Sequence, residues 1–274
     1  MDFTDDATAT DRESSTERID TDRVAVITGV GRRRSIGAGL ATGLAADGWN
    51  LVLNAWRPYD ERLGYERTPD DPEAIADECR ALGVTVEVVF GDLADPAFPA
   101  ELVGRAARLG PVSGLVMSHC ESVDSSILTT DVDSWDRHFA VNARATWLLI
   151  KAFAEQLPVQ EAPPRVAGRI VALTSDHTVN NLPYGASKGA LDRIVTAAAV
   201  ELGDRGVRAN VINPGPIDTG WMTDDIRRWG TEATPAGRLG TPSDTADLVR
   251  FLFSPAGSWI NGQVLSSNGG FNVG

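Results

Sequence analysis

The stretch NLPYGASKGALDRI, residues 181–194, contains side chains that could do chemistry in two different ways. The letters GASKG fit the Gly-x-Ser-x-Gly turn that exposes the nucleophilic serine of many hydrolases, here Ser187. The letters YGASK place Tyr184 four residues before Lys188, and on a helix this spacing puts both side chains on one face. The two interpretations predict different enzymes.

The hydrolase interpretation fails on the order of its residues. A nucleophile elbow follows a strand, and its acid and histidine come later in the chain. The histidines are His119, His138 and His177, so none follows Ser187. The sequence before Ser187 is also helical in pattern. Ser187 is therefore predicted to be an ordinary helix residue.

The Tyr184–Lys188 pair could transfer protons. A tyrosine has a pKa of about 10 and is a poor acid at neutral pH. A neighbouring ammonium favours the phenolate, so Lys188 is expected to lower the pKa of Tyr184 toward the range where acid–base catalysis is efficient. An isolated Tyr-x-x-x-Lys is usually an ordinary aromatic residue beside a solvated lysine, so the surrounding elements must decide.

Strand-like and helical stretches alternate along the chain. Strands are expected at 23–28, 50–55, 84–90, 112–118, 168–174, 207–213 and 263–267, and helices at 35–48, 71–83, 96–110, 132–157, 183–203 and 243–253. This alternation is typical of βαβ units, and the near-continuous apolar strands indicate a parallel sheet covered on both faces. We expect one doubly wound α/β domain over residues 21–274, with about seven strands.

Composition excludes several classes of protein. The net charge of −13 repels phosphate backbones, so nucleic-acid binding is not expected. The two cysteines do not suggest a disulfide framework, which fits a reducing cytosol. No apolar run is long enough to span a membrane, and the N-terminus has no apolar signal core. Residues 1–20 are rich in acids, Ser and Thr and are expected to form a disordered tail. We expect a cytoplasmic protein.

Ligands of such sheets bind at the carboxyl ends of the strands. The first expected strand runs into TGVGRRRSIGAGLA. Glycines allow the backbone to approach a pyrophosphate, and the N-terminus of the next helix offers free N–H groups and a positive dipole end. A Gly-rich turn alone is a weak signal, but the strand before it and the helix after it strengthen a prediction of dinucleotide binding.

At this point the chain resembles the short-chain dehydrogenase/reductase family, whose glycine motif is Thr-Gly-x-x-x-Gly-Ile-Gly. Thr28, Gly29, Ile36 and Gly37 match it, with two extra residues between the halves and Ser35 in place of the middle glycine. This loop length is similar to that of the enoyl-acyl-carrier-protein reductases of the same superfamily. The resemblance implies a Rossmann-type fold over residues 21–274.

Further motifs extend the resemblance through nearly the whole chain. Asp92 matches the acid that usually meets the adenine, and Asn142 matches the asparagine of the fourth long helix. NPGPIDTG, residues 213–220, resembles the motif that holds the nicotinamide amide, and INGQ and NGG resemble the usual C-terminal motifs. The implied cofactor-binding residues are Gly29, Gly31, Arg34, Ser35, Ile36, Gly37, Arg57, Asp92, Leu93, Ser118, Tyr184, Lys188, Pro214, Gly215, Ile217 and Thr219.

The resemblance also implies catalytic roles. Tyr184 would be the general acid or base, and Ser175 would polarise the substrate oxygen. Lys188 would lower the pKa of Tyr184 and hold the nicotinamide ribose, and Asn142 would position a proton-relay water. Enoyl reductases usually separate the tyrosine and lysine by six residues, whereas three lie between them here. The pair is therefore similar to that of 3-oxoacyl-acyl-carrier-protein reductase-like carbonyl reductases, which predicts carbonyl–alcohol interconversion.

Two segments depart from the family pattern. Ser175 is only nine residues before Tyr184, a shorter loop than usual, and Thr174 could take its place. VMSHCE, residues 116–121, stands where the family has Asn-Asn-Ala-Gly, so His119 replaces a small residue. His119 and His177 could each be packed or solvent-facing, or could shape substrate recognition.

The end of the second strand bears on the choice of cofactor. An acid there would bond the ribose of NAD, but the position holds Ala55, followed by Trp56 and Arg57. The glycine loop adds three arginines, residues 32–34, and arginine binds phosphate through its planar fork. These arginines could be only a solvated charge run. We expect NADP(H) to be preferred, with NAD(H) possible, and no metal.

The substrate is not readable from the sequence. A lid over a small carbonyl or alcohol is expected at about 220–240, with Trp221 and Met222 facing the substrate. Family members usually pair through the helices expected at 132–157 and 183–203, which predicts a homodimer or homotetramer. The alternatives are an NAD-preferring alcohol dehydrogenase, or a catalytically weak nucleotide-binding member that acts as a sensor or scaffold.

Overall fold

Seven parallel strands form one sheet in the computed structural model, which describes residues 22–65, 71–162 and 164–272. The strand order is β3-β2-β1-β4-β5-β6-β7, so the prediction of a doubly wound parallel sheet is confirmed. The expected tail at residues 1–20 lies outside the described residues. The strands are β1 (Val24–Thr28), β2 (Asn50–Ala55), β3 (Val86–Phe90), β4 (Val112–Met117), β5 (Gly168–Leu173), β6 (Val207–Asn213) and β7 (Val264–Ser266).

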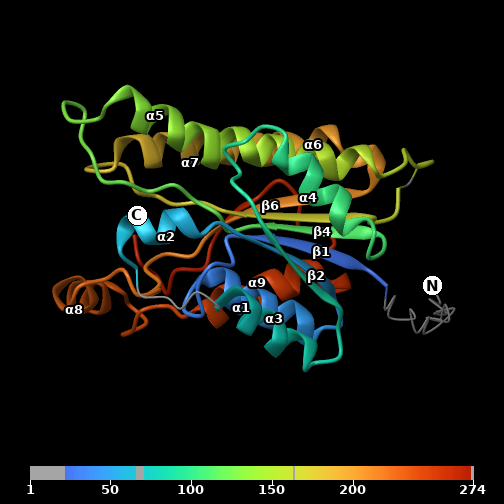
Figure 1. The fold of residues 1–274 in the computed structure, drawn as a ribbon, viewed down its shortest axis with the longest axis horizontal. Coiled ribbons are helices and arrows are strands. Elements are labelled where there is room, and N and C mark those ends of the chain that lie inside the picture. Colours follow the sequence, from blue (N-terminus) through green and yellow to red (C-terminus); the bar gives the residue numbers. More distant parts are fainter. Residues whose placement is uncertain (1–21, 66–70, 163, 273–274) are drawn as a thin grey trace, which may run out of the picture.

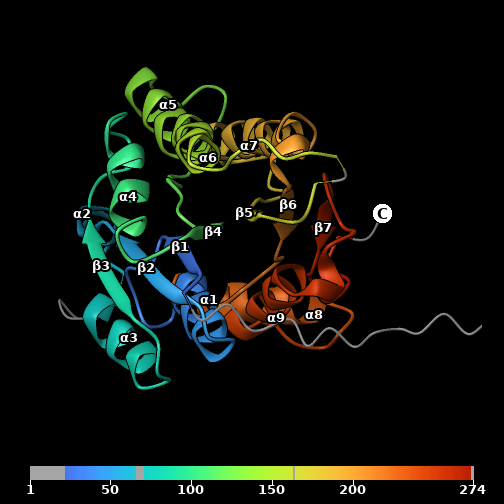
Figure 2. The same cartoon turned by 90° about the vertical axis from the view of Figure 1, so that its right-hand side faces the viewer.

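Helices cover both faces of the sheet (Figure 2). One face carries α4 (Phe98–Ala106), α6 (Ala145–Glu155) and α7 (Leu182–Glu201), and the other carries α1 (Ile36–Ala46), α3 (Asp71–Arg80) and α9 (Pro242–Phe253). All five residues of β1 are buried, because alternate side chains enter the two apolar layers on either side. This explains the near-continuous apolar strands of the sequence.

The stretch expected as one helix at 132–157 has three parts. It consists of α5 (Val132–His138), the π-helix η1 (Phe139–Arg144) and α6. A π-helix has wider i→i+5 turns and commonly occurs as a single turn near functional sites. Here the wide turn carries Asn142, which is fully buried.

Two helices at the site were not predicted as helices. The first, α2 (Arg57–Leu63), follows β2 directly, with Pro58 in its first turn and Gly64 ending it at a φ of 64°. Proline suits a helix start, and glycine suits this left-handed end. The second, α8 (Asp224–Ala233), lies within the expected lid and is capped by Thr223, whose hydroxyl accepts from the N–H of Ile226.

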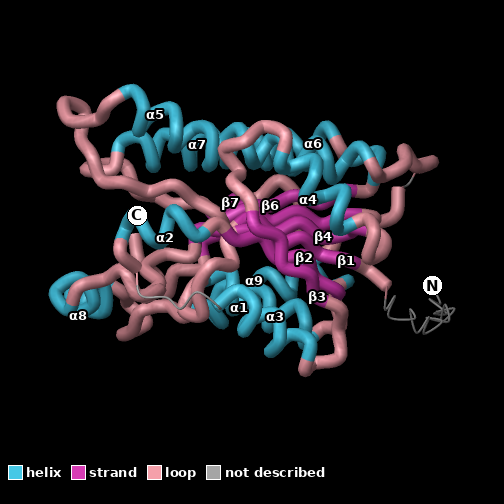
Figure 3. The backbone as a smooth tube through the Cα atoms, in the orientation of Figure 1, coloured by secondary structure: helices cyan, strands magenta, loops and turns pink. Residues whose placement is uncertain are grey.

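The strand register brings the loops of interest to one edge of the sheet. Thr28 pairs with Asn54 on one side and with Met117 on the other, so the residues after β1 and β4 are neighbours. Figure 3 shows the loops gathered at this carboxyl edge, and Figure 1 shows α2 and α8 at the same end. None of the described helices is long and apolar enough to cross a membrane.

Candidate active site and cofactor pocket

The glycine loop lies directly against the end of β4. Gly29 has a φ of +76°, and a Cβ on it would lie 2.7 Å from the Ser118 carbonyl oxygen. A Cβ on Gly37 would lie 2.5 Å from the Gly29 carbonyl oxygen. Both positions therefore require glycine for close approach as well as, at Gly29, for backbone conformation. The hydroxyl of Ser35 accepts from the N–H of Ala38 at 3.1 Å and caps α1.

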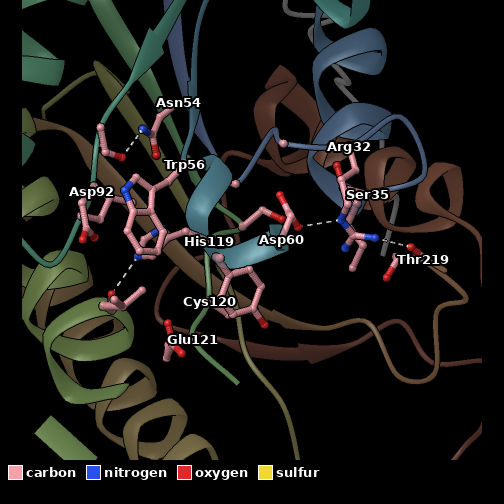
Figure 4. Close-up of a pocket in the computed structure, with 18 of the residues that line it drawn as sticks. Arg32, Ser35, Asn54, Trp56, Asp60, Asp92, His119, Cys120, Glu121 and Thr219 are labelled. Carbon is pink, nitrogen blue, oxygen red and sulfur yellow. Dashed lines mark hydrogen bonds and ion pairs between the residues drawn. The ribbon is translucent and has the colours of Figure 1, made fainter. Parts of the chain in front are cut away.

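A pocket opens above this loop at the carboxyl edge of the sheet (Figure 4). The N-terminus of α1 faces it through Ser35 and Ile36, which favours an anion there. The predicted residues that line it are Gly29, Gly31, Ser35, Ile36, Asp92, Leu93, Ser118, His119 and Thr219. The close glycine backbone, the helix N-terminus and the acid Asp92 at the far wall fit a nicotinamide dinucleotide.

The predicted phosphate-binding arginines are placed differently from one another. Arg34 is half exposed and pairs with Asp218 at 3.2 Å, outside the pocket lining. Arg57 is also outside the lining, with its guanidinium 4.3 Å above the ring of Phe90. Arg32 lines the pocket, although it was considered only as part of the arginine run.

The loop after β6 forms a wall next to the pocket. Pro214, Gly215 and Ile217 are outside the lining, and this loop positions Thr219, which is inside it. Gly215 has a φ of +66°, and a Cβ there would collide with Asn268 of the NGG motif. In the lid, Met222 is buried, whereas Trp221 is 47% exposed and its indole N–H donates to the Ile217 carbonyl at 3.3 Å.

Ser175, Tyr184 and Lys188 lie together at the end of β5. A hydrogen bond from the Ser175 side chain lowers the pKa of Tyr184, but burial raises it by more, so the net pKa is raised. Lys188 donates to the Leu173 carbonyl at 2.7 Å, with its ammonium 5.7 Å from the centre of the Tyr184 ring. The expected lowering of the Tyr184 pKa by Lys188 is therefore wrong for this structure, because burial is the largest cause of the shift and Lys188 is not among its causes.

Asn142 joins the segment after β4 to the helix α7. Its side-chain amide exchanges two hydrogen bonds of 2.8 Å with the backbone of Glu121 and donates to the hydroxyl of Ser187 at 2.9 Å. Ser187 is fully buried and donates in turn to the Tyr184 carbonyl at 2.8 Å. The side chain of Ser187 thus serves the packing of α7 against the pocket segment, which agrees with its exclusion as a nucleophile.

The two histidines differ in their surroundings. His119 is buried, with Nδ1 2.7 Å from the Thr28 hydroxyl and Nε2 3.0 Å from the Val141 carbonyl. Burial lowers its pKa from 6.5 to about 3, so its ring is neutral at physiological pH. His177 is exposed, and its backbone N–H donates to the Ser175 hydroxyl at 3.1 Å.

Several lining residues were missed by sequence reasoning. Trp56, Tyr59 and Asp60 enter the pocket from the N-cap and first turn of the unpredicted α2. Glu121 and Arg137 enter from the facing wall. Arg137 donates to both carboxylate oxygens of Asp92, at 2.7 and 3.1 Å, and lies 4.4 Å above the Trp56 ring. The Pro at the start of α2 and the Gly at its end could have been used to predict this helix. No sequence pattern indicated the long-range ion pairs.

The thiol of Cys120 lies between the pocket and the Tyr184–Lys188 pair. Cys120 lines the pocket, and it interacts electrostatically with both Tyr184 and Lys188. Burial raises the pKa of this thiol, which keeps it protonated. Among the described residues, no group of three or more His, Cys, Asp or Glu side chains is placed to hold a metal.

Comparison with known proteins agrees with this geometry. The family model described as enoyl-(acyl carrier protein) reductase matches residues 29–272. The uncharacterized oxidoreductase YjdA of Bacillus subtilis (strain 168) is 32% identical over 255 residues, which cover 91% of this chain and 97% of that protein. The chain belongs to the short-chain dehydrogenase/reductase superfamily of oxidoreductases.

Two solved structures share the fold. A blue fluorescent protein from a metagenomic library, in complex with NADPH, is 30% identical, with a TM-score of 0.77 over 92% of this chain and 98% of that one. A short-chain dehydrogenase from Burkholderia cenocepacia J2315, in complex with NADP, is 29% identical, with a TM-score of 0.79 and the same coverage.

Proposed function

We propose that this protein is an NADP(H)-dependent oxidoreductase that interconverts a carbonyl compound and a secondary alcohol. The observation that carries the proposal is the cluster of Ser175, Tyr184 and Lys188 beside the pocket, with the Ser175 side chain hydrogen-bonded to Tyr184. Such a cluster can hold a carbonyl oxygen between two hydroxyl groups, one of which transfers a proton.

A bound nicotinamide would supply or accept the hydride. Tyr184 would donate its proton to the carbonyl oxygen, and Ser175 would donate a hydrogen bond to the same oxygen. The raised pKa of Tyr184 keeps the phenol protonated at neutral pH, which favours reduction over oxidation. Lys188, with its ammonium anchored on the Leu173 carbonyl, would stabilise the phenolate that remains.

The preference for NADP(H) is supported by the two solved relatives, which were crystallised with NADPH and NADP. It is also supported by the residue at the end of β2, Ala55, which has no carboxylate to bond a ribose. Tyr-x-x-x-Lys spacing favours carbonyl chemistry over the enoyl reduction named in the matching family model.

The test is a panel of aldehydes, ketones, secondary alcohols and enoyl thioesters, each assayed with NADPH and NADH or their oxidised forms. We expect turnover of carbonyl compounds with NADPH, tighter binding of NADPH than of NADH, and turnover lower by about a hundredfold or more in Tyr184→Phe. Turnover of enoyl thioesters alone would contradict the proposal. Cofactor binding without turnover of any compound in the panel would instead support the sensor or scaffold alternative.

A further inference from the structure

The side chain of Arg32 lines one end of the cofactor pocket, where it joins Asp60 to Thr219 (Figure 4). It starts in the glycine loop, and its Nε lies 2.9 Å from the Asp60 carboxylate on α2. One terminal nitrogen donates to the Thr219 carbonyl at 2.7 Å, in the loop that leads to the lid. The Arg32 and Asp60 side chains are only 11% and 9% exposed, so solvent screens this ion pair weakly.

The place of Asp60 is fixed by α2. Its carboxylate lies against the glycine loop, so close that a Cβ added to Gly31 would be 2.7 Å from Oδ2 of Asp60. The same helix is held to the opposite wall, where Arg62 pairs with the buried Glu121 and Tyr59 hydrogen-bonds to Cys120. The carboxylate therefore stands in the pocket beside the loop that binds the cofactor backbone in this superfamily.

Both guanidinium groups of the described lining are already paired with carboxylates. Arg32 has Asp60, and Arg137 has Asp92 together with Glu121, which lies 3.3 Å from Nε. A nicotinamide dinucleotide carries a diphosphate, and NADP(H) adds a 2′-phosphate. Asp60 holds Nε and the Thr219 carbonyl holds one terminal nitrogen, so a phosphate that takes a forked, charge-assisted contact on the Nε side of Arg32 must displace the Asp60 carboxylate.

We propose that Asp60 is a positioning residue that competes with a cofactor phosphate for Arg32 and thereby sets the affinity of the pocket for the dinucleotide. This inference rests on the proposed function only in that the ligand is a phosphate-bearing nicotinamide cofactor. It places an affinity-limiting acid on α2, four residues beyond Trp56, although the usual position at the end of β2 holds Ala55.

The experiment is a double-mutant cycle on the full chain, read by fluorescence titration with NADPH and with NADH. Asp60→Asn should tighten binding by about tenfold, the size of one hydrogen bond to a charged group. Arg32→Gln should weaken it by a similar factor. In Arg32→Gln, adding Asp60→Asn should bring no gain, because no guanidinium remains to be released.

The two cofactors identify the phosphate. A gain for NADPH alone assigns Arg32 to the 2′-phosphate, and an equal gain for both assigns it to the diphosphate. Glu78→Gln is the matched control, because Glu78 pairs with the neighbouring Arg33 outside the pocket, and it should leave both affinities unchanged.

Three results would overturn the proposal. Asp60→Asn could bind the cofactors more weakly than the wild type, or equally well, which includes the case in which neither protein binds them. Asp60→Asn could also tighten binding in the Arg32→Gln background. The last would mean simple repulsion by the carboxylate. Circular dichroism verifies folding, and Asp60→Ala replaces Asp60→Asn if the latter does not fold. If the double-mutant cycle gives the expected affinities but no carbonyl compound in the panel is turned over, the proposed function is contradicted and this inference stands.

Discussion

The hydroxyl of Thr28 donates to Nδ1 of His119 across 2.7 Å and so joins the end of β1 to the segment after β4. The direction follows from the other ring nitrogen, because Nε2 faces the Val141 carbonyl, which can only accept. His119 is therefore a neutral crosslink in which both nitrogens are bonded to the protein. The structural role of His119 is to hold the end of β1 against the segment after β4.

This crosslink predicts acid sensitivity. The pKa of His119 is about 3 when folded and 6.5 for an ordinary histidine, so between these values the unfolded chain binds a proton that the folded protein does not. The stability contribution is complete above about pH 6.5 and falls as the pH drops toward 3, by up to about 1.4 kcal/mol per pH unit.

The measurement is urea unfolding between pH 7 and pH 4. His119→Asn should be less stable than the wild type at pH 7 and should lose less stability as the pH falls. His177→Asn, which removes an exposed imidazole, is the matched control and should follow the wild type. An unchanged slope in His119→Asn would show that its ring does not titrate as the structure implies.

Substitutions of Tyr184 and Lys188 should differ in their effects on turnover and on cofactor affinity. Tyr184→Phe deletes one oxygen, so turnover should fall by about a hundredfold or more while cofactor affinity survives. Lys188→Ala should lose turnover and also weaken the cofactor, because Lys188 is assigned to both the tyrosine and the ribose. Steady-state kinetics and NADPH titration separate these effects, and an active Tyr184→Phe would refute the assigned acid.

The raised pKa of Tyr184 predicts opposite pH profiles for the two directions. Carbonyl reduction needs the protonated phenol and should stay flat through neutral and mildly alkaline pH. Alcohol oxidation needs the phenolate and should still be rising at about pH 10, the ordinary tyrosine pKa. A plateau in oxidation well below pH 10 would mean that the Lys188 charge lowers the pKa after all.

Ser187→Ala should harm stability more than chemistry. It leaves the buried Asn142 amide with one acceptor fewer, which should cost about 1–3 kcal/mol in thermal or urea unfolding. Turnover should largely remain, since Ser187 has no chemical role. Ser175→Ala is the complementary variant and should lose turnover with little change in melting temperature. The reverse order of damage would revive the nucleophilic serine.

The outer face of α6 and α7 should form a contact between copies of the chain. Trp147 on α6 is 51% exposed and Val200 on α7 is 80% exposed, so apolar surface remains uncovered there. Trp147→Glu should shift light scattering from a dimer or tetramer toward a monomer. Leu82→Glu, which alters a similarly exposed residue just beyond α3, should leave the assembly unchanged.

Local patterns predicted the frame of this site, and long-range pairings did not. Gly29, Ser35 and Gly37 could be placed because a strand, a tight turn and a helix start are all encoded within a dozen neighbouring residues. Tyr184 and Lys188 were found by spacing on a single helix. The protonation state of Tyr184 could not be, because it depends on burial by segments far away in the chain.

The ion pair between Arg32 and Asp60 in the pocket wall was likewise not predictable from local sequence patterns. Asp60 is an unremarkable acid in the sequence, and its partner Arg32 looked like one member of a charge run. Their meeting depends on how a seven-residue helix packs on the glycine loop. Nothing in either local pattern fixes that packing, so the pairing could be found only in three dimensions.

The π-helix between α5 and α6 also sets a rotational phase. Each residue advances an α-helix by about 100°, and a single wide turn absorbs one residue without breaking the helix. Deleting Ala143 or Arg144, which lie between Asn142 and Trp147, would therefore turn everything before the gap by about a quarter revolution relative to everything after it. Asn142 could then no longer face Glu121 while Trp147 faced outward. The extra residue in the π-helix therefore lets one continuous helix bury Asn142 and expose Trp147.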